Sequence, residues 1–192
     1  MPKVITFSRQ FPSYHPKAGQ PTFFVEQVLN SLGINSCDRE YIFNLQRWNI
    51  KALEAKKITP YDLIHFQHSL NNIAKGEKKH TIRFGYRWEA GEKASLRVWF
   101  GKPYNSPQII FAPQVELVKV ADFKIVLDRY NLPWIDIGSR YSCPAPIDFE
   151  RSIIPMIAKN DGLETDDLLA WFKYPKPFEG QILVWGKGVD YV

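Results

Sequence analysis

The sequence predicts an α+β fold: a small, mostly antiparallel β-barrel with flanking helices and an N-terminal helical insertion. Residues 4–7 form an early β-rich run, residues 21–75 keep a helical apolar period, and short alternating runs follow Gly76. Several short strands in succession favour a barrel or a sandwich. With 192 residues, 45% of them hydrophobic, the chain can bury one core. We therefore expect one domain over residues 1–192, with residues 21–75 as an insertion or lid; two small domains are the alternative.

The individual helices and strands are predicted from the spacing of apolar residues and from the Gly, Pro and Asn residues that bound each segment. Three stretches of the helical block have an apolar period near 3.6 residues together with start or stop signals, and these are residues 21–33, 38–57 and 59–75. Later strands are expected where alternating runs lie between Gly, Pro and Asn, at residues 81–84, 95–100, 108–111, 115–127, 133–143 and 178–185. A short helix is expected between Pro144 and Pro155, and a second one over residues 166–172 after an acidic start.

Targeting and cysteine signals are weak. Residues 1–11 contain no long apolar core or cleavage site of a signal peptide, and no run approaches the roughly 20 apolar residues of a membrane span. Cys37 and Cys143 are far apart and have no partners at metal-like spacing. His65 and His68 have such spacing but no third ligand. We expect a cytoplasmic protein with no disulfide, metal or cofactor.

The positive charge is concentrated in one segment. The chain has a net charge of +5, and residues 75–103 contain eight basic and three acidic side chains, which is the whole excess. Such a segment produces a local positive field for an anionic partner, or it is a solvated basic face. Its basic residues are Lys75, Lys78, Lys79, Arg83, Arg87, Lys93, Arg97 and Lys102.

Three motifs occur in a recognisable order. Residues 78–83 read Lys-Lys-His-Thr-Ile-Arg and are followed by Trp88-Glu-Ala-Gly-Glu92; residues 157–163 read Ile-Ala-Lys-Asn-Asp-Gly-Leu, and residues 178–185 read Phe-Glu-Gly-Gln-Ile-Leu-Val-Trp. In this order the motifs resemble the ASCH family of the PUA-like superfamily. The resemblance covers about residues 4–11 and 61–185, and the helical block interrupts it.

The resemblance implies a barrel of five or six strands, with a helix over one opening and a cleft that takes RNA, nucleotides or modified bases. One branch of the family, the small bacterial N4-acetylcytidine amidohydrolases, uses a Lys, a Thr and a Glu. These positions match Lys78, Thr81 and, near the third, Asp161. Asp161 is one methylene shorter than Glu, and Glu164 and Asp166 compete for its role.

Amide hydrolysis needs a nucleophile, a base and an oxyanion stabiliser. Thr81 is the candidate nucleophile, and Lys78 is its base if burial or nearby cations lower the pKa of the amine. Asp161 would then orient the lysine. The alternative interpretation is an ordinary basic turn entering a strand, with Asp161 as a cap before Gly162.

Binding requires only cations for phosphates and flat side chains for bases. Alternation within strands sends about half of the aromatic side chains into the core. His80 would titrate or contact a phosphate, or else face solvent, and loop 101–107 would contact a ligand or simply connect two strands. The predicted binding residues are Lys79, His80, Arg83, Arg87, Trp88, Arg97, Lys102 and Tyr104.

Three functions remain open from the sequence. The first is binding of RNA, single-stranded nucleic acid or a modified nucleotide through a basic cleft. The second is hydrolysis of an N4-acylated cytidine-type nucleoside. The third is a protein-interaction module that docks a partner through residues 21–75. The predicted fold does not choose among the three, because one fold can serve many functions.

Overall fold

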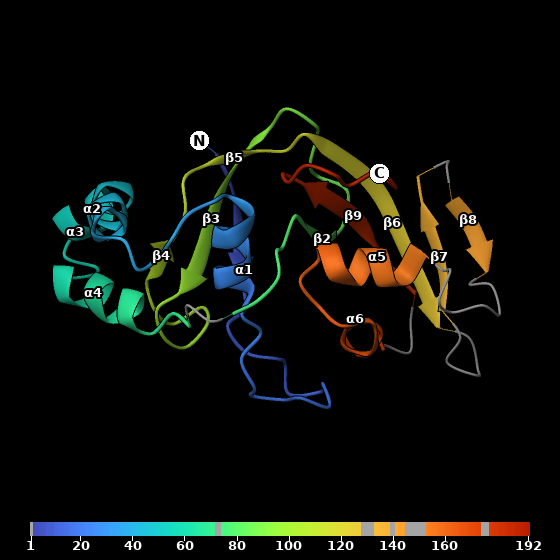
Figure 1. The fold of residues 1–192 in the computed structure, drawn as a ribbon, viewed down its shortest axis with the longest axis horizontal. Helices are drawn as coiled ribbons and strands as arrows, with labels where there is room; N and C mark the ends of the chain where they lie inside the picture. Colours follow the sequence, from blue (N-terminus) through green and yellow to red (C-terminus); the bar gives the residue numbers. More distant parts are fainter. Residues whose placement is uncertain (1, 72–73, 128–132, 139–140, 145–152, 174–176) are drawn as a thin grey trace.

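The computed structural model describes residues 2–71, 74–127, 133–138, 141–144, 153–173 and 177–192 (Figure 1). The helices within these ranges are α1 (Phe24–Ser31), α2 (Arg39–Trp48), α3 (Ile50–Glu54), α4 (Pro60–His68), α5 (Ile153–Asn160) and α6 (Thr165–Trp171). The strands are β1 (Lys3–Phe7), β2 (His80–Phe84), β3 (Lys93–Trp99), β4 (Gln108–Ile110), β5 (Val115–Glu116), β6 (Lys119–Leu127), β7 (Pro133–Ile137), β8 (Tyr141–Pro144) and β9 (Phe178–Val184).

The strands form two sheets. The first has the order β1-β3-β4, with β5 also paired to β3, and the second has the order β2-β9-β6-β7-β8. All pairs are antiparallel except β1 with β3, which run parallel. Over the described residues neither sheet closes on itself. The predicted α+β class and mostly antiparallel pairing are therefore confirmed, whereas the closed barrel is wrong.

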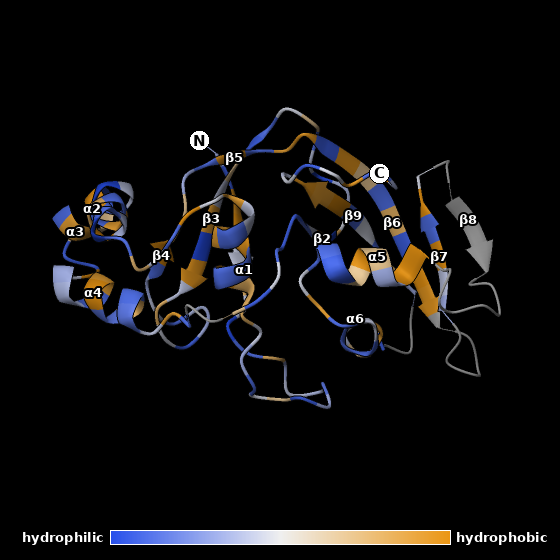
Figure 2. Cartoon of the chain, in the orientation of Figure 1, coloured by the Kyte–Doolittle hydropathy of each residue, from blue (hydrophilic) through white to orange (hydrophobic). Residues whose placement is uncertain are grey.

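The first sheet packs its apolar face against α1. Ile5 and Phe7 alternate with more exposed residues on β1, and Leu96 and Val98 do the same on β3. Helix α1 covers this face with an apolar stripe that includes Val28, which is fully buried. Figure 2 shows hydrophilic and hydrophobic bands alternating along β3 and mixed colouring on the helices beside it.

Helices α2, α3 and α4 pack at the β4 edge of the first sheet (Figure 1). The Tyr41 hydroxyl donates to the carbonyl of Phe111 at 2.9 Å, and the Asn49 amide exchanges two hydrogen bonds with the backbone of Ile110. Asn49 thereby occupies backbone groups that an edge strand leaves open. Helices occur in all three predicted stretches of the block, but the stretch 38–57 divides into α2 and α3, and α4 ends at His68 and not near residue 75. Phe43 and Tyr61 on its outer face are each 67% exposed, and the partner-docking role of residues 21–75 stays a prediction.

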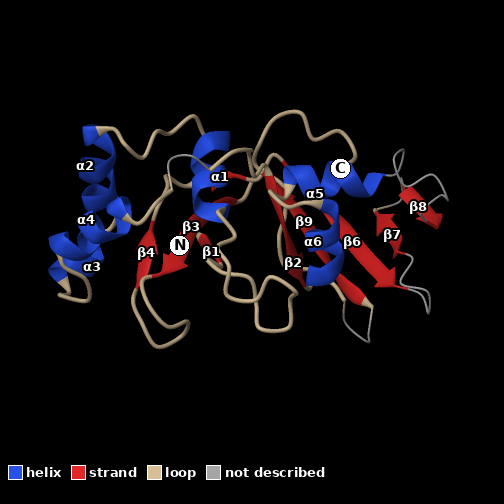
Figure 3. Ribbon diagram, turned by 60° about the horizontal axis from the view of Figure 1, so that its bottom comes forward, coloured by secondary structure: helices blue, strands red, loops and turns tan. Residues whose placement is uncertain are grey.

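The second sheet is covered by α5 and α6 (Figure 3). Strand β9, which lies between β2 and β6, is buried on both sides from Gly180 to Val184, which is why residues 182–184 read as a continuous apolar run. Ile157 of α5 and Leu168 of α6 have no exposed surface. This packing places the turn after α5 next to the start of β2, where the candidate site lies.

One predicted strand proves to be two. The run at residues 115–127 divides into β5 and β6 because Leu117 donates its backbone N–H to Glu92 and Val118 donates to Val184, which takes the chain from one sheet to the other. The predicted segment 133–143 likewise contains β7 and β8. No helix in the described part of the chain is long and apolar enough to cross a bilayer.

Candidate functional site

A buried ion pair lies between the two sheets. The Lys78 ammonium donates to Asp161 Oδ1 at 2.6 Å and to the Asp161 carbonyl at 2.5 Å, and it lies 4.1 Å from the centroid of the Phe24 ring. Lys78 is 1% exposed and Asp161 is 7% exposed. His80 is completely buried, with Nδ1 at 3.4 Å from Asp161 Oδ1. A lysine this deeply buried is rare unless it is paired.

Burial controls the protonation of this cluster. Loss of water lowers the pKa of Lys78 to about 8, although the charge of Asp161 raises it in part. Burial also lowers the pKa of His80, so this imidazole is neutral at pH 7. For Asp161, burial alone raises the pKa, but Lys78 and His80 together bring it below its usual value. Asp161 is therefore ionised, and its partner is an unusually acidic lysine.

The position of Asp161 is set by the end of α5. Gly162 follows it with a φ of 74°, a conformation that glycine adopts without strain. The Leu163 N–H donates to Ala158 and the Gly162 N–H donates to Lys159, which is a Schellman ending. A side chain at Gly162 would collide with Gln27 Oε1 and lie 3.3 Å from Lys78 Cβ. The sequence Asp-Gly after an apolar helix thus delivers a carboxylate to the lysine.

The backbone around Lys78 is held from three sides. Lys78 donates its N–H to the Gln27 carbonyl of α1 at 3.0 Å, and Lys79 donates to the Asn160 carbonyl of α5 at 2.7 Å. The Lys79 carbonyl accepts from Trp185, just beyond β9, at 3.1 Å. These bonds fix the pleat of the segment, so Lys78 points inward and Lys79 points toward solvent.

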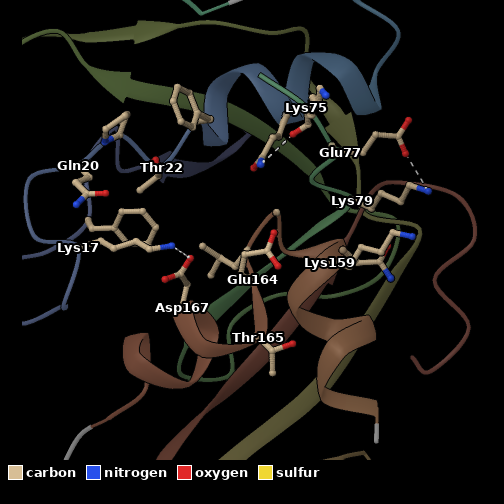
Figure 4. A pocket seen from close by; sticks show the side chains of 18 of the residues that line it. Lys17, Gln20, Thr22, Lys75, Glu77, Lys79, Lys159, Glu164, Thr165 and Asp167 are labelled. Carbon is tan, nitrogen blue, oxygen red and sulfur yellow. Dashed lines mark hydrogen bonds and ion pairs between the residues drawn. The ribbon is translucent and has the colours of Figure 1, made fainter. Parts of the chain in front are cut away.

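A pocket of about 770 Å³ is lined by chain neighbours of this cluster, and Figure 4 shows the side chains around it. Its walls come from loop 11–23, from α1, from residues 75–79 and from residues 155–167 of the α5–α6 region. Lys79, Asn160 and Gly162 line it, whereas their chain neighbours Lys78 and Asp161 lie behind the wall.

The pocket carries four lysines and three carboxylates. Two of the lysines are paired, Lys17 with Asp167 at 2.7 Å and Lys79 with Glu77 at 3.0 Å (Figure 4). No ion pair is found for the other two within the described ranges. The charged lining residues are Lys17, Lys75, Lys79, Lys159, Glu77, Glu164 and Asp167.

Loop 11–23 is fixed to α6 on the other side of the pocket. His15 is buried, accepts at Nδ1 from the Lys17 N–H at 3.1 Å, and contacts the Asp167 carbonyl through Nε2 at 3.1 Å. Its ring stacks on Phe11 at a centroid distance of 4.4 Å. This wall therefore has a defined shape despite its three prolines and irregular backbone.

The structure brings the three predicted catalytic residues together only in part. Lys78 and Asp161 are in direct contact. Thr81 is 5% exposed, and no hydrogen bond of its hydroxyl to Lys78 or Asp161 occurs among the described residues. Glu164 is exposed in the pocket and Asp166 is exposed on α6, so Asp161 is the carboxylate at the lysine.

The predicted binding residues do not share one surface. Lys79 lines the pocket, but His80 and Trp88 are interior, 0% and 4% exposed. The interpretation of His80 as a solvent-facing strand residue is therefore wrong, and its side chain offers no exposed surface to a phosphate in this structure. The Gln181 amide fixes the backbone of Trp88, because it accepts from the Trp88 N–H at 3.0 Å and donates to the Trp88 carbonyl at 3.2 Å.

The remaining members lie apart from the pocket. Arg83 donates to the Thr6 carbonyl at 2.7 Å, and Arg97 donates to the Ser95 hydroxyl at 3.1 Å. Arg87 is exposed on the turn after β2, and Lys102 and Tyr104 are exposed on loop 101–107. The expectation of one basic wall made by residues 75–103 is thus met only by Lys75 and Lys79.

Several pocket residues were not predicted from the sequence, among them Lys17, Gln27 and Lys159. Lys17 lies in a proline-containing loop, Gln27 lies on α1 and Lys159 lies on the last turn of α5. Lys159 is two residues before Asp161, so its position next to the predicted carboxylate could have identified it as a site residue. Nothing local distinguishes the other two, because a fold contact over more than 130 residues brings them there. No group of three potential metal ligands occurs in the described part of the chain.

We compared the chain with known protein families, curated proteins and solved structures. No protein-family model, curated protein or solved structure matches the chain. The chemistry of the site therefore follows from its own geometry.

Proposed function

We propose that the chain binds a nucleotide or a single-stranded nucleic acid in the pocket outside the Lys78–Asp161 pair. The observation that carries the proposal is the charge of that pocket, which four lysines line. Lys75 and Lys159 are exposed there and have no carboxylate partner in the described residues. Lysine ammonium groups bind phosphate as point charges, and single strands are bound mainly through such contacts.

The rest of the lining fits a nucleotide. The volume of about 770 Å³ is in the range of small-molecule sites. Gln20, Gln27 and Asn160 provide amides that can hydrogen-bond a base, and Gln27 Oε1 is buried without a partner in the described structure. Phe23 lines the same pocket with a φ of 56°, and strained residues of this kind cluster at ligand sites. Its ring offers a face on which a base can stack.

The test compares two double variants of equal charge. Lys75→Ala/Lys159→Ala removes the two unpaired pocket lysines, and Lys51→Ala/Lys57→Ala removes two exposed lysines outside the pocket. Titration with uridine 5′-monophosphate should show affinity about 10-fold lower for the first variant and unchanged for the second. Equal affinities for the two variants, or no binding by the wild type, would contradict the proposal.

We propose hydrolysis of an N4-acylated cytidine-type nucleoside as a second candidate, because the structure joins Lys78 to a carboxylate in a dry site. With a pKa of about 8, about one Lys78 amine in ten is neutral at pH 7 and can accept a proton. Lys78 would take the Thr81 proton while the hydroxyl oxygen attacks the acyl carbon, then give it to the departing exocyclic amine. Water would release the acyl group from Thr81 as a carboxylate.

This reaction requires a change in the wall of the pocket. Lys78 is covered by Lys79 and Gly162, and its amine is bonded to Asp161 and not to Thr81. Binding therefore ranks first. The test is release of acetate from N4-acetylcytidine, which Thr81→Ala should abolish and Thr81→Ser should partly retain. A wild-type protein that releases no acetate excludes this activity.

A further inference from the structure

A second pocket lies at the ends of β1 and β3. Its volume is about 460 Å³, and it includes residues that follow the last residue of each strand. Its lining comes from the last residues of β1 and β3, from residues 8–10 and 19–21 of the segment between β1 and α1, and from residues 100–103 after β3. The lining residues are Phe7, Ser8, Arg9, Gln10, Gly19, Pro21, Trp99, Phe100, Gly101 and Pro103.

The chemistry of this pocket differs from that of the lysine pocket. No carboxylate occurs among its described lining residues, and its cation is Arg9. The Arg9 guanidinium itself bonds outside the pocket, because it donates to the Ser69 hydroxyl and carbonyl at 3.0 and 3.1 Å and Ser69 does not line the pocket. Trp99 and Phe100 provide aromatic surface, and Phe100 is 39% exposed. An aromatic pocket whose described lining has no acidic side chain suits a flat, uncharged ring such as a nucleobase.

A strained tyrosine stands beside Trp99. Tyr104 has a φ of 65°, which is an outlier for a bulky residue, and its side chain is 88% exposed. The ring centroids of Tyr104 and Trp99 are 5.4 Å apart. Ser106 holds the loop closed, because its hydroxyl accepts from the Gly101 N–H at 3.0 Å and donates to the Lys102 carbonyl at 2.9 Å. The loop thus keeps an exposed aromatic ring in a costly conformation, which points to a ligand contact.

The two pockets are adjacent. Pro21 lines both, while Gly19 lines the aromatic pocket and Gln20 lines the lysine pocket. Backbone bonds from Phe11 to Gln20 at 2.9 Å and from Thr22 to Arg9 at 3.1 Å hold this segment as a fixed ridge. A ligand that fills both pockets must cross the ridge at Pro21.

We propose that the ligand is a single-stranded nucleic acid of at least two nucleotides, with one phosphate among the lysines and a neighbouring base in the aromatic pocket. The inference rests on the proposed nucleotide binding and adds a second subsite lined by Trp99 and Phe100, with the exposed Tyr104 ring beside Trp99. Stacking on these rings tolerates any base, because every base has a π-face.

The experiment measures binding of uridine 5′-monophosphate, a uridine hexanucleotide and a thymidine deoxyhexanucleotide to the wild type and to three variants. Phe100→Ala removes a lining ring and Tyr104→Gly removes the ring beside Trp99, and Phe43→Ala removes a ring on α2 that is 67% exposed, between the 39% of Phe100 and the 88% of Tyr104, as the control. Tyr104→Gly also relieves the positive φ, so this variant should fold at least as well as the wild type.

The hexanucleotides should bind at least 10-fold more tightly than the monophosphate, and each subsite variant should lose about 10-fold in hexanucleotide affinity only. Phe43→Ala should match the wild type. Equal affinities for hexanucleotide and monophosphate, or unchanged hexanucleotide affinity in both subsite variants, would overturn the second subsite while leaving lysine-dependent monophosphate binding intact. Absence of monophosphate binding would instead sink the proposed function. The ratio of the affinities for the uridine hexanucleotide and the thymidine deoxyhexanucleotide shows whether the protein prefers RNA or DNA.

Discussion

At the scale of single residues, Lys78 and Asp161 depend on each other. Removing water from either charge is costly, and their contact at 2.6 Å recovers part of that cost. Loss of one partner leaves the other charge buried and unpaired. Buried ionisable groups beside a pocket often serve function more than stability.

This dependence predicts a non-additive double-mutant cycle. Lys78→Met and Asp161→Leu should each lower the free energy of unfolding by about 3–5 kcal/mol, because each leaves one buried charge. The double variant should lose less than either single variant. Urea denaturation of all four proteins measures this, and additive losses would show that the pair does not interact.

The lowered pKa of Lys78 predicts a pH dependence. In the unfolded chain the amine has its ordinary pKa of 10.5, and in the folded chain it has a pKa of about 8. Between these values the unfolded state binds more protons, so folding becomes more favourable as the pH rises.

Relative to Lys78→Met, the wild type should therefore gain about 1 kcal/mol in unfolding free energy from pH 7 to pH 9. Denaturation at several pH values checks it. A constant difference would mean that Lys78 titrates in the fold as it does in water.

The contact between Lys78 and Asp161 could be expected from the sequence, but the burial of His80 could not. The resemblance of residues 78–83 and 157–163 to known motifs pairs Lys78 with Asp161, and the structure places them in contact. The burial of His80 was not predictable, because it follows from Tyr191, whose ring lies 6.0 Å away, and from α5. Such contacts join segments that are distant in sequence.

At the scale of elements, the α5 ending positions the carboxylate. Gly162 serves both the turn, through its positive φ, and the packing, since Gln27 and Lys78 leave no room for a side chain. Gly188 has a similar φ of 76°, and no atom lies within 4 Å of the position that a methyl group would take there, so it isolates the backbone effect.

Gly162→Ala should therefore cost more than Gly188→Ala. The second change should lower stability by about 1 kcal/mol from backbone strain alone, and the first by about 2–3 kcal/mol because Gln27 must also move. Thermal melts of the two variants compare them directly. Equal losses would mean that Gln27 does not pack against this turn.

Most elements were predictable because their apolar periods and Gly or Pro boundaries are local signals. The wrongly predicted elements depend on contacts between segments that are distant in sequence. Residues 115–127 read as one strand, yet the chain changes sheets at Leu117, where pairing to Glu92 and Val184 takes over. Closure of a sheet depends on which strands meet at the edges, and no local period encodes that.

At the scale of the whole molecule, the segment that is most basic in the sequence is not the surface where lysines gather in the fold. Residues 75–103 hold the entire net charge of +5, but alternation and burial send Lys78 inward and spread the other cations over several surfaces. The lysine pocket is instead assembled from four places in the chain, at Lys17, Lys75, Lys79 and Lys159. Composition predicted an anionic partner, and only the fold shows where such a partner would meet several lysines.

Salt dependence of single-strand binding tests the central claim most directly. A labelled uridine hexanucleotide would be titrated with the wild type and with Lys75→Ala/Lys159→Ala over a series of salt concentrations. If the pocket lysines contact phosphates, the logarithm of the wild-type affinity should fall linearly with the logarithm of salt concentration, and the variant should have a slope shallower by about 1 to 1.5. Parallel lines for the two proteins, or an affinity that ignores salt, would contradict the account.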